Sequence, residues 1–336
     1  MNRFLLFILL VSCNMSIAQK PVSLSFEDSI QYWMHVHKVP VTGVGIIENN
    51  EIKLAKVYGA DEHTLFNVAS LTKPITSIVT LKLIDDKRWN LDEPIFHYWT
   101  DPDVKNDSFA KKLTTRLLLS HQSGFPNWRS EDSSQILEFH FEPGTKYSYS
   151  GEGFEYLRHA LEKKFHESLQ QIAYTNLFKK VGMNQTHFGW TDQASRALYA
   201  VPNDTNGLPI PGAPKKIINA ADWLVTTIDD YTKFAAYVIN GAGISKELFA
   251  TMISPQVPIN KGTYTESMGL GWAVMRGLPD DEYLLMHTGH DEGVNTVVIL
   301  LPKSGRGIVI LTNGENGKKV IFKLLKKLLQ IPGLVP

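Results

Sequence analysis

The sequence predicts an α+β fold, in which an antiparallel sheet is flanked by helices and a mainly helical subdomain is inserted. A helical pattern and a hairpin signal occupy the first part of the chain, and strand patterns return only near its end. The long segment between them has mostly helical and loop character. Runs of helices that separate runs of strands are typical of α+β domains, and 336 residues are enough to bury a large core.

The first elements are a helix and a β-hairpin. Apolar residues recur at helical spacing in residues 24–36, which predicts an amphipathic helix. Residues 41–47 and 52–58 have strand character. Asn49 and Asn50 lie between them, and asparagine tolerates the left-handed conformation of a tight turn. We therefore expect these two strands to pair.

The middle of the chain is predicted to be helical. Residues 75–84 are apolar on most of the helix circumference, which indicates a buried helix. Residues 89–206 show little alternation of apolar and polar residues and are interrupted by prolines. Residues 220–239 are predicted to form a second helical stretch.

Strand patterns dominate the last part of the chain, and a helix ends it. Residues 302–305 form a tight-turn sequence, Pro-Lys-Ser-Gly. An amphipathic helix is expected over residues 320–330. The four expected strands are residues 270–275, 283–287, 294–301 and 307–312. The α/β part is thus predicted to comprise about 22–88 and 207–336, and the helical subdomain about 89–206.

Composition and charge exclude several functional classes. The chain has 34 basic and 34 acidic residues, so its formal net charge is zero and bulk electrostatics give no reason to expect nucleic-acid binding. The eleven histidines form no His-Glu-x-x-His motif and no Cys/His cluster, so we expect no metal and no other cofactor. Cys13 is the single cysteine, which leaves no disulfide in the folded part.

The N-terminus has the pattern of an export signal. Arg3 precedes an apolar run over residues 4–11, which is too short to span a bilayer. Cleavage after Ala18 would make residues 1–18 a signal peptide and 19–336 the mature chain. A second interpretation is a lipobox that ends at Cys13, which would leave a lipid anchor there. Both interpretations predict export, either to the periplasm or medium or as an outer-membrane lipoprotein, with no transmembrane helix in the mature chain.

A Ser-x-x-Lys motif provides the first candidate for chemistry. Ser70 and Lys73 are three residues apart, so one helical turn would bring the amine to the hydroxyl. Pro74 indicates that the motif lies at a helix start, because proline is tolerated in the first turn. A serine hydroxyl becomes nucleophilic when a neighbouring group accepts its proton. By itself this spacing also fits an ordinary N-cap serine and a solvated lysine.

Five further motifs follow the first in a fixed order, and together they carry a resemblance. The chain resembles the serine β-lactamase-related family: class C β-lactamases, D-Ala-D-Ala carboxypeptidases, D-aminopeptidases and esterases with the same fold. The resemblance covers about residues 41–313 and implies the β-lactamase/transpeptidase-like fold. The six segments are Phe66–Thr76, Leu117–Gly124, Pro143–Ser150, Val181–Thr186, Met268–Trp272 and His287–Gly289.

The resemblance assigns catalytic roles to three residues. Ser70 would be the acylated nucleophile, and Lys73 would keep its proton mobile. Tyr149 matches the family's Tyr-x-Asn motif, and a phenolate would be favoured beside a lysine. Either Lys73 or Tyr149 could be the general base. Tyr147 is the alternative match for the motif tyrosine.

The third motif would line the substrate cleft. Thr288 could hydrogen-bond a substrate carboxylate or carbonyl, and Gly289 would allow close approach to the backbone. The backbone N–H groups of Ser70 and His290 would form an oxyanion hole. His287 stands where many β-lactamases have a lysine, and histidine titrates near 6.5, so we expect only partial positive charge at pH 7.

The second motif ends in Gly151 where the family usually has asparagine. Without that amide we expect weaker turnover of β-lactams and peptides. The resemblance therefore predicts a serine hydrolase that uses a Ser70 acyl-enzyme on esters, D-amino-acid peptides or cell-wall-type amides. The alternatives are a class C-like β-lactamase, or a penicillin-binding, sensor-like protein with little turnover. The expected partner is a small molecule or peptide with a carbonyl group.

Overall fold

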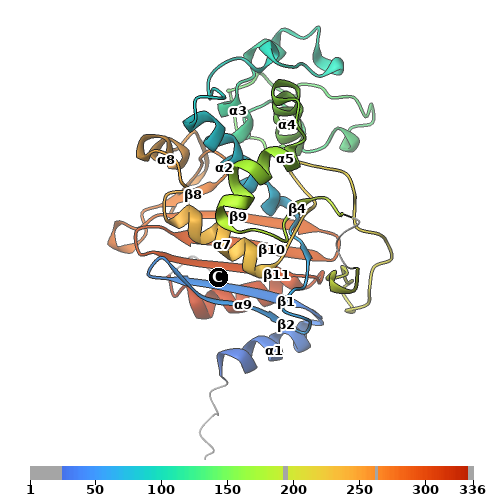
Figure 1. Cartoon of the computed structure of the whole chain (residues 1–336), viewed down its shortest axis with the longest axis vertical. Coiled ribbons are helices and arrows are strands. Elements are labelled where there is room, and N and C mark those ends of the chain that lie inside the picture. The colour runs from blue at the N-terminus through green and yellow to red at the C-terminus, as the bar shows by residue number, and fades with distance from the viewer. Residues whose placement is uncertain (1–24, 192–195, 262–263, 332–336) are drawn as a thin grey trace, which may run out of the picture.

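An eight-stranded antiparallel sheet lies at the centre of the molecule (Figure 1). The computed structural model describes residues 25–191, 196–261 and 264–331. The predicted signal peptide and Cys13 lie outside these ranges. In spatial order the strands are β2 (Glu51–Tyr58), β1 (Thr42–Glu48), β11 (Arg306–Thr312), β10 (Val294–Leu301), β9 (Leu284–Asp291), β8 (Ala273–Arg276), β7 (Thr265–Met268) and β6 (Val257–Lys261).

The N-terminal hairpin joins the sheet through a pairing between the two ends of the chain. β1 pairs with β11, with Val44 opposite Ile310. Asn49 and Asn50 form the hairpin turn with φ of 52° and 65°, which confirms the left-handed turn expected from the sequence. The discontinuous sheet and the α+β class are therefore confirmed.

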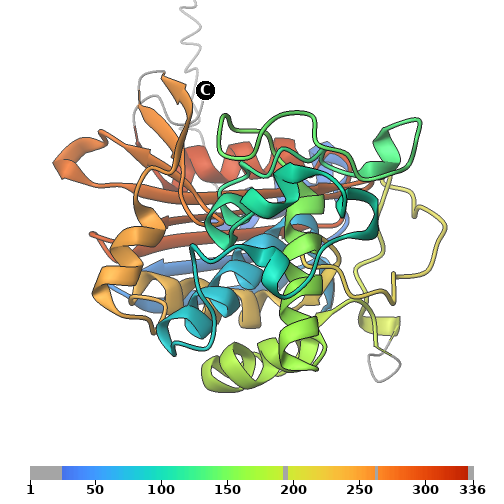
Figure 2. The same ribbon diagram turned by 90° about the horizontal axis from the view of Figure 1, so that it is seen from above.

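Helices cover both faces of the sheet. The apolar sides of α1 (Phe26–His37) and α9 (Gly317–Leu328) pack on one face. α2 (Thr72–Asp85) and α7 (Ile228–Ile239) lie on the opposite side, as Figure 2 shows with α9 in red and α7 in yellow. The other helices are α3 (Thr115–Leu119), α4 (Gly151–Phe165), α5 (Leu169–Ala173), α6 (Lys179–Val181) and α8 (Lys246–Ile253).

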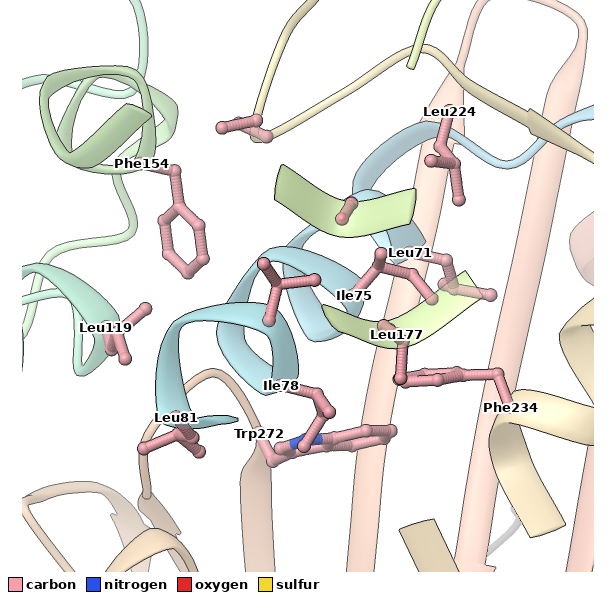
Figure 3. Close-up of a cluster of buried hydrophobic side chains, with 14 of the residues drawn as sticks. Leu71, Ile75, Ile78, Leu81, Leu119, Phe154, Leu177, Leu224, Phe234 and Trp272 are labelled. Carbon is pink, nitrogen blue, oxygen red and sulfur yellow. The ribbon is translucent and has the colours of Figure 1, made fainter. Parts of the chain in front are cut away.

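α2 is buried on nearly its whole circumference, as its apolar pattern predicts. All its residues are buried except Ile84 and Asp85. Figure 3 shows Ile75 and Ile78 among side chains such as Phe154 of α4 and Trp272, which directly precedes β8. Because this helix is packed from every side, it holds the lysine of the Ser-x-x-Lys motif in a fixed position.

A small second sheet braces the start of α2. β3 (Phe66–Asn67) and β4 (His187–Phe188) both pair with β5 (Leu224–Thr226). Residues 224–226 were expected to be helical, and this part of the prediction is wrong. Trp223 has a φ of 62°, which no α-helix accepts, and the helix begins only at Ile228.

The C-terminal strands follow the prediction unevenly. β10 coincides with the expected segment, residues 294–301, whereas residues 270–275 include the turn between β7 and β8. β6 and α8 were not predicted. Within the described residues, no helix has both the length and the apolar character needed to cross a bilayer.

Candidate active site

Ser70 lies in a short 3₁₀ turn directly before α2, close to the expected helix start. The turn spans Ala69–Leu71 and is partly buried at Ser70. Ala69 has a φ of 49°, an unusual backbone conformation for a residue with a side chain. The carboxamide oxygen of Asn67 accepts the Ala69 N–H at 2.9 Å. This contact stabilises the sharp turn that presents the serine.

Lys73 reaches Ser70 as the motif predicts. Its Nζ lies 3.0 Å from Ser70 Oγ and donates to the carbonyl of Ala221 at 2.9 Å. The side chain is 0% exposed. Burial lowers the pKa of Lys73 to about 7, although the negative charges of Asp222, Asp291 and Glu155 oppose the shift. An amine with this pKa is partly neutral at pH 7 and can accept a proton.

Hydrogen bonds attach the loop that carries Ala221 to α2 and to α4. Thr76 Oγ1 donates to the Ala220 carbonyl at 2.7 Å, and the Leu224 N–H donates to Thr72 Oγ1 at 3.1 Å. The Ala220 N–H donates to Glu155 at 2.6 Å. A main-chain carbonyl in a fixed loop thus holds the lysine. The sequence could not indicate this contact, because every residue type has a main-chain carbonyl.

Tyr149 lies beside the serine and the lysine. Its hydroxyl faces the Ser70 side chain, and Lys73 Nζ lies 4.6 Å from the centre of its ring. Burial raises the pKa of the phenol well above its usual value of 10, and the contact with Ser70 only partly offsets this. The expected phenolate is therefore wrong for the free protein, because the amine faces the ring and burial disfavours the anion.

His121 fixes the segment that carries Tyr149. Its Nδ1 accepts the Ser150 N–H at 3.0 Å, and its carbonyl accepts the Ser148 N–H at 2.9 Å. The imidazole is fully buried and lies 4.3 Å from the Tyr149 ring, centre to centre. Burial, together with Lys73 and His287, lowers the pKa of His121 well below its usual value. It acts as a neutral support for Tyr149.

The third motif approaches the nucleophile through its glycine. A Cβ placed on Gly289 would lie 2.5 Å from the Val68 carbonyl oxygen and 3.1 Å from the Ser70 nitrogen. Only glycine lets β9 pass this close to the turn that carries the serine. The backbones of Ser70 and β9 therefore come together, as an oxyanion hole requires.

His287 lies on the same side of β9, near Tyr149. The two ring centres are 6.3 Å apart, and Nδ1 of the imidazole lies 2.8 Å from the Thr288 carbonyl. Burial lowers the pKa of His287 to about 3, and Lys73 adds to the shift. The expected partial positive charge at pH 7 is therefore wrong, since the imidazole is neutral there.

Thr288 and His290 belong to the opposite side of the strand. Both side chains are exposed, and they line a pocket of about 590 Å³ that lies against α9. Nδ1 of His290 lies 3.2 Å from the Val294 carbonyl. Of the sequence-predicted residues, the structure thus brings Ser70, Lys73, Tyr149 and His287 together, while the side chains of Thr288 and His290 point elsewhere.

A pair of carboxyl groups beside Lys73 was not predicted as part of the site. Asp222 and Asp291 hydrogen-bond each other, and the Asn67 amide donates to Asp291 at 2.7 Å. Burial and the charge of Asp291 raise the pKa of Asp222 to about 8. The pair therefore holds one shared proton at neutral pH. Asp222 is only 8% exposed, so it is not a solvated surface carboxylate.

The position of one member of this pair, Asp291, could have been predicted from the sequence. Asp291 follows Gly289 by two residues, so strand alternation places it on the same face. Beside the pair lies a pocket of about 470 Å³, which Asn67, Trp223 and Asp291 help to line. Among the described residues, no three histidine, cysteine or acidic side chains are grouped so that they could hold a metal ion.

Gly151, the first residue of α4, lies against Trp128. A Cβ at this position would be 2.6, 2.7 and 2.9 Å from three carbons of the indole ring. The place where the family usually has an asparagine side chain is therefore filled by an aromatic one. The contact between Trp128 and Gly151 could not be predicted, because the two residues are far apart in the sequence.

Two solved structures share the fold, although their sequences are distant. An octameric penicillin-binding protein homologue from Pyrococcus abyssi aligns with 92% of this chain and 78% of its own, with a TM-score of 0.75 and 20% identity. D-alanine carboxypeptidase AmpC from Burkholderia cenocepacia aligns with 90% of this chain and 99% of its own, with a TM-score of 0.72 and 19% identity. These likenesses show the β-lactamase/transpeptidase-like fold.

Curated relatives are equally distant in sequence. Protein flp of Staphylococcus aureus (strain N315) is 22% identical over 316 residues, which cover 84% of this chain and 61% of flp. A Pseudomonas fluorescens protein named beta-lactamase is 21% identical and covers 85% of this chain and 92% of its own. The family model described as Beta-lactamase matches residues 26–329. With nearly all of the described chain inside that match, this protein is a member of the beta-lactamase family.

Proposed function

We propose that this protein is a serine hydrolase that acts through an acyl-enzyme on Ser70. The observation that carries the proposal is the position of Lys73, whose buried amine lies 3.0 Å from the serine oxygen with a pKa lowered to about 7. A base with a pKa near the working pH is well suited to proton transfer. We assign this role to Lys73, since burial keeps Tyr149 protonated.

The proposed reaction has two halves. Neutral Lys73 accepts the hydroxyl proton while Ser70 Oγ bonds to the substrate carbonyl carbon, and the developing oxyanion is held by the backbone N–H groups of Ser70 and His290. The protonated lysine returns a proton through Tyr149 to the leaving group as its bond to carbon breaks. Water then attacks the acyl-enzyme and gives its proton to the same pair, and Ser70 leaves with a proton.

The substrates proposed are esters, D-amino-acid peptides or cell-wall-type amides. The neutral His287 supports a site without a fixed cation for a β-lactam carboxylate. A class C-like β-lactamase is the second candidate, and the name of the Pseudomonas relative favours it. A penicillin-binding, sensor-like protein with little turnover is the third.

A fluorophosphonate probe and a substrate panel test these proposals. We expect the probe to label Ser70 in the native protein and not in Ser70→Ala, while Ser304→Ala, an exposed turn residue, serves as the matched control. We expect p-nitrophenyl esters to be hydrolysed faster than nitrocefin. Efficient nitrocefin turnover would favour the β-lactamase, and labelling without turnover of any substrate would favour the sensor. No labelling of Ser70 would refute the proposed hydrolase.

We also propose that the chain is exported. The apolar run after Arg3 supports this proposal. Mass spectrometry of the protein from its native cell envelope tests it: a chain that begins at Gln19 indicates signal-peptidase cleavage, and a lipid-modified Cys13 indicates anchoring. A full-length, unmodified chain in the cytoplasm would contradict the proposal.

A further inference from the structure

The indole of Trp128 occupies space beside the catalytic segment that glycine leaves open. Three ring carbons would lie within 2.9 Å of a Cβ at Gly151. Gly151 follows Tyr149 by two residues, and the N–H of the intervening Ser150 is held by the buried His121. The indole therefore packs directly on the short segment that carries Tyr149, whose hydroxyl faces Ser70.

Main-chain contacts fix the backbone on the N-terminal side of Trp128. The Asn127 carbonyl accepts the N–H groups of Gly151 and Glu152, each at 3.0 Å. The Asn127 side-chain oxygen also accepts the Gly151 N–H at 3.0 Å. These contacts attach the residue before the tryptophan to the first turn of α4.

A partly buried ion-pair cluster fixes the backbone on the other side. The Arg129 N–H donates to Glu152 at 3.0 Å, and its guanidinium lies 2.9 Å from both Asp101 and Glu152. Asp101 and Glu152 are 5% and 6% exposed. Hydrogen bonds between a charged arginine and a carboxylate are stronger than those between neutral groups. With both neighbours held, the half-buried indole has a defined place rather than a free surface position.

The ring carbons at Gly151 can neither donate nor accept a conventional hydrogen bond. An acyl group that carries an amide next to its carbonyl would have to leave that amide unpaired here, which is unfavourable. An aliphatic or aromatic acyl group would instead bury apolar surface against the indole.

We propose that Trp128 is a specificity-determining residue that forms an apolar wall of the acyl-group subsite and selects apolar acyl groups over acylamino groups. The proposal rests on the proposed function, since it names the substrate class of the Ser70 site. On this proposal, Gly151 is needed because a larger residue would collide with the indole.

Two esters that differ in the acyl group test the proposal. The ratio of kcat/KM for p-nitrophenyl butanoate to that for the p-nitrophenyl ester of N-acetylglycine is measured in each variant. We expect the ratio to fall about tenfold in Trp128→Ala, within the range that a small change in an apolar pocket produces, and less in Trp128→Phe. The half-buried Trp99, which stacks on His159, provides the matched control Trp99→Ala. An unchanged ratio in Trp128→Ala would overturn the proposal.

A double substitution separates specificity from packing. We expect Gly151→Asn alone to lower the melting temperature, because the side chain collides with the indole, and to give no gain on the acylamino ester. In Trp128→Ala/Gly151→Asn we expect the melting temperature to recover relative to Gly151→Asn and the relative turnover of the acylamino ester to rise about tenfold. If the single and double variants have the same ratio of turnover, the indole does not control this subsite.

A binding measurement keeps the test independent of turnover. In Ser70→Ala, butanoate is expected to shift the indole N–H resonance of Trp128, assigned with Trp128→Phe, at lower concentration than N-acetylglycinate. If Ser70 is never labelled but this shift is seen, the proposed hydrolase fails while the subsite stands. If Ser70 is labelled and butanoate leaves the Trp128 resonance unmoved, the subsite fails while the hydrolase stands.

Discussion

Lys73 is a fully buried amine whose surroundings supply both a carbonyl partner and two carboxyl groups. Its Nζ contacts Ser70 and the Ala221 carbonyl, while Asp222 and Asp291 stabilise its charged form. Burial still dominates, because transfer of a charge from water to the protein interior is very unfavourable. The residue is therefore adapted to lose its proton near neutral pH, which is unusual for a lysine.

The pH dependence of hydrolysis follows from this environment. Below pH 7 Lys73 is protonated and cannot accept the serine proton, so kcat/KM is expected to rise with pH through a midpoint near the lowered pKa of about 7. His287 does not interfere, because its pKa of about 3 lies far below. Lys73→Arg is expected to lose about 10³-fold in kcat/KM at every pH. A rising limb centred near pH 10 in the native enzyme would contradict this assignment.

Asp222 gives a prediction for stability. Its folded pKa is raised to about 8, whereas an unfolded aspartate titrates near 3.8, so the folded form binds the proton more tightly. This contribution to stability is present below pH 3.8 and is lost progressively as the pH rises to about 8. In Asp222→Asn the side-chain amide can still donate a hydrogen bond to Asp291, but it does not titrate. We expect its melting temperature, relative to the native protein, to increase between pH 4 and pH 8, and a constant difference would contradict the shared proton.

Single residues were predictable from the sequence when a local motif carried them. Ser70 and Lys73 are one helical turn apart, and their contact follows from that spacing. The partners of Lys73 come from distant loops, and the Ala221 carbonyl has no sequence signature at all. The protonation states of Tyr149 and His287 were misjudged for a related reason, since burial is a property of the whole fold and it outweighs the reference pKa.

At the scale of elements, β1 and α7 lie in unusually close contact. A Cβ on Gly45 would be 2.0 Å from Thr232 Oγ1, which itself donates to the Ile228 carbonyl at 2.6 Å. Glycine in a strand interior usually marks such an approach of another element. The position of α7 on the sheet therefore depends on this glycine.

Gly45→Ala should push the helix from the strand. We expect a loss of about 1–3 kcal/mol in the free energy of unfolding, the usual result of overpacking. Thr232→Ala removes the colliding atoms, so in its background Gly45→Ala should be markedly less costly. Urea unfolding of the four proteins in a double-mutant cycle measures the coupling. Strictly additive effects would show that the two residues do not limit the packing of β1 on α7.

Elements with one clear pattern were predicted well, and mixed segments were not. β10 is mostly apolar and every one of its residues is buried, and its bounds match the expected residues 294–301. Residues 220–226 look compatible with a helix locally, but they are fixed by hydrogen bonds to α2 and by pairing with β3. These tertiary contacts override local propensity.

At the scale of the whole molecule, one core joins the sheet to the inserted helical region. The same buried cluster includes Val298 of β10, Ile78 of α2, and Leu118 and Phe154 of the helical region. Ser70 lies where these parts meet, between α2 and β9. Because no part buries its apolar surface alone, we expect the sheet and helices to unfold together.

Asn313 connects three distant parts of the chain in this assembly. Its side-chain oxygen accepts the Val41 N–H at 2.8 Å before β1, and its amide donates to the Val201 carbonyl at 2.8 Å. Its own carbonyl accepts from the Asn203 amide at 3.1 Å, and the side chain is nearly inaccessible at 3% exposure. The residue thus ties the end of β11 to the first strand and to the segment after the helical region.

Removal of this side chain should weaken the molecule as a whole without touching the reacting groups. Asn313→Ala leaves the Val41 N–H without its partner, whereas the Val201 carbonyl keeps the Asn203 amide as a second donor. An unpaired buried group costs about 1–3 kcal/mol. We therefore expect a loss of about 1–3 kcal/mol in urea unfolding, still in a single transition, with kcat of the folded fraction unchanged. Asn313→Asp keeps the acceptor for Val41 and loses the donor to Val201, so its loss should be intermediate near neutral pH. Two separate unfolding transitions, or an unchanged stability in Asn313→Ala, would show that these contacts of Asn313 do not stabilise the molecule as a whole.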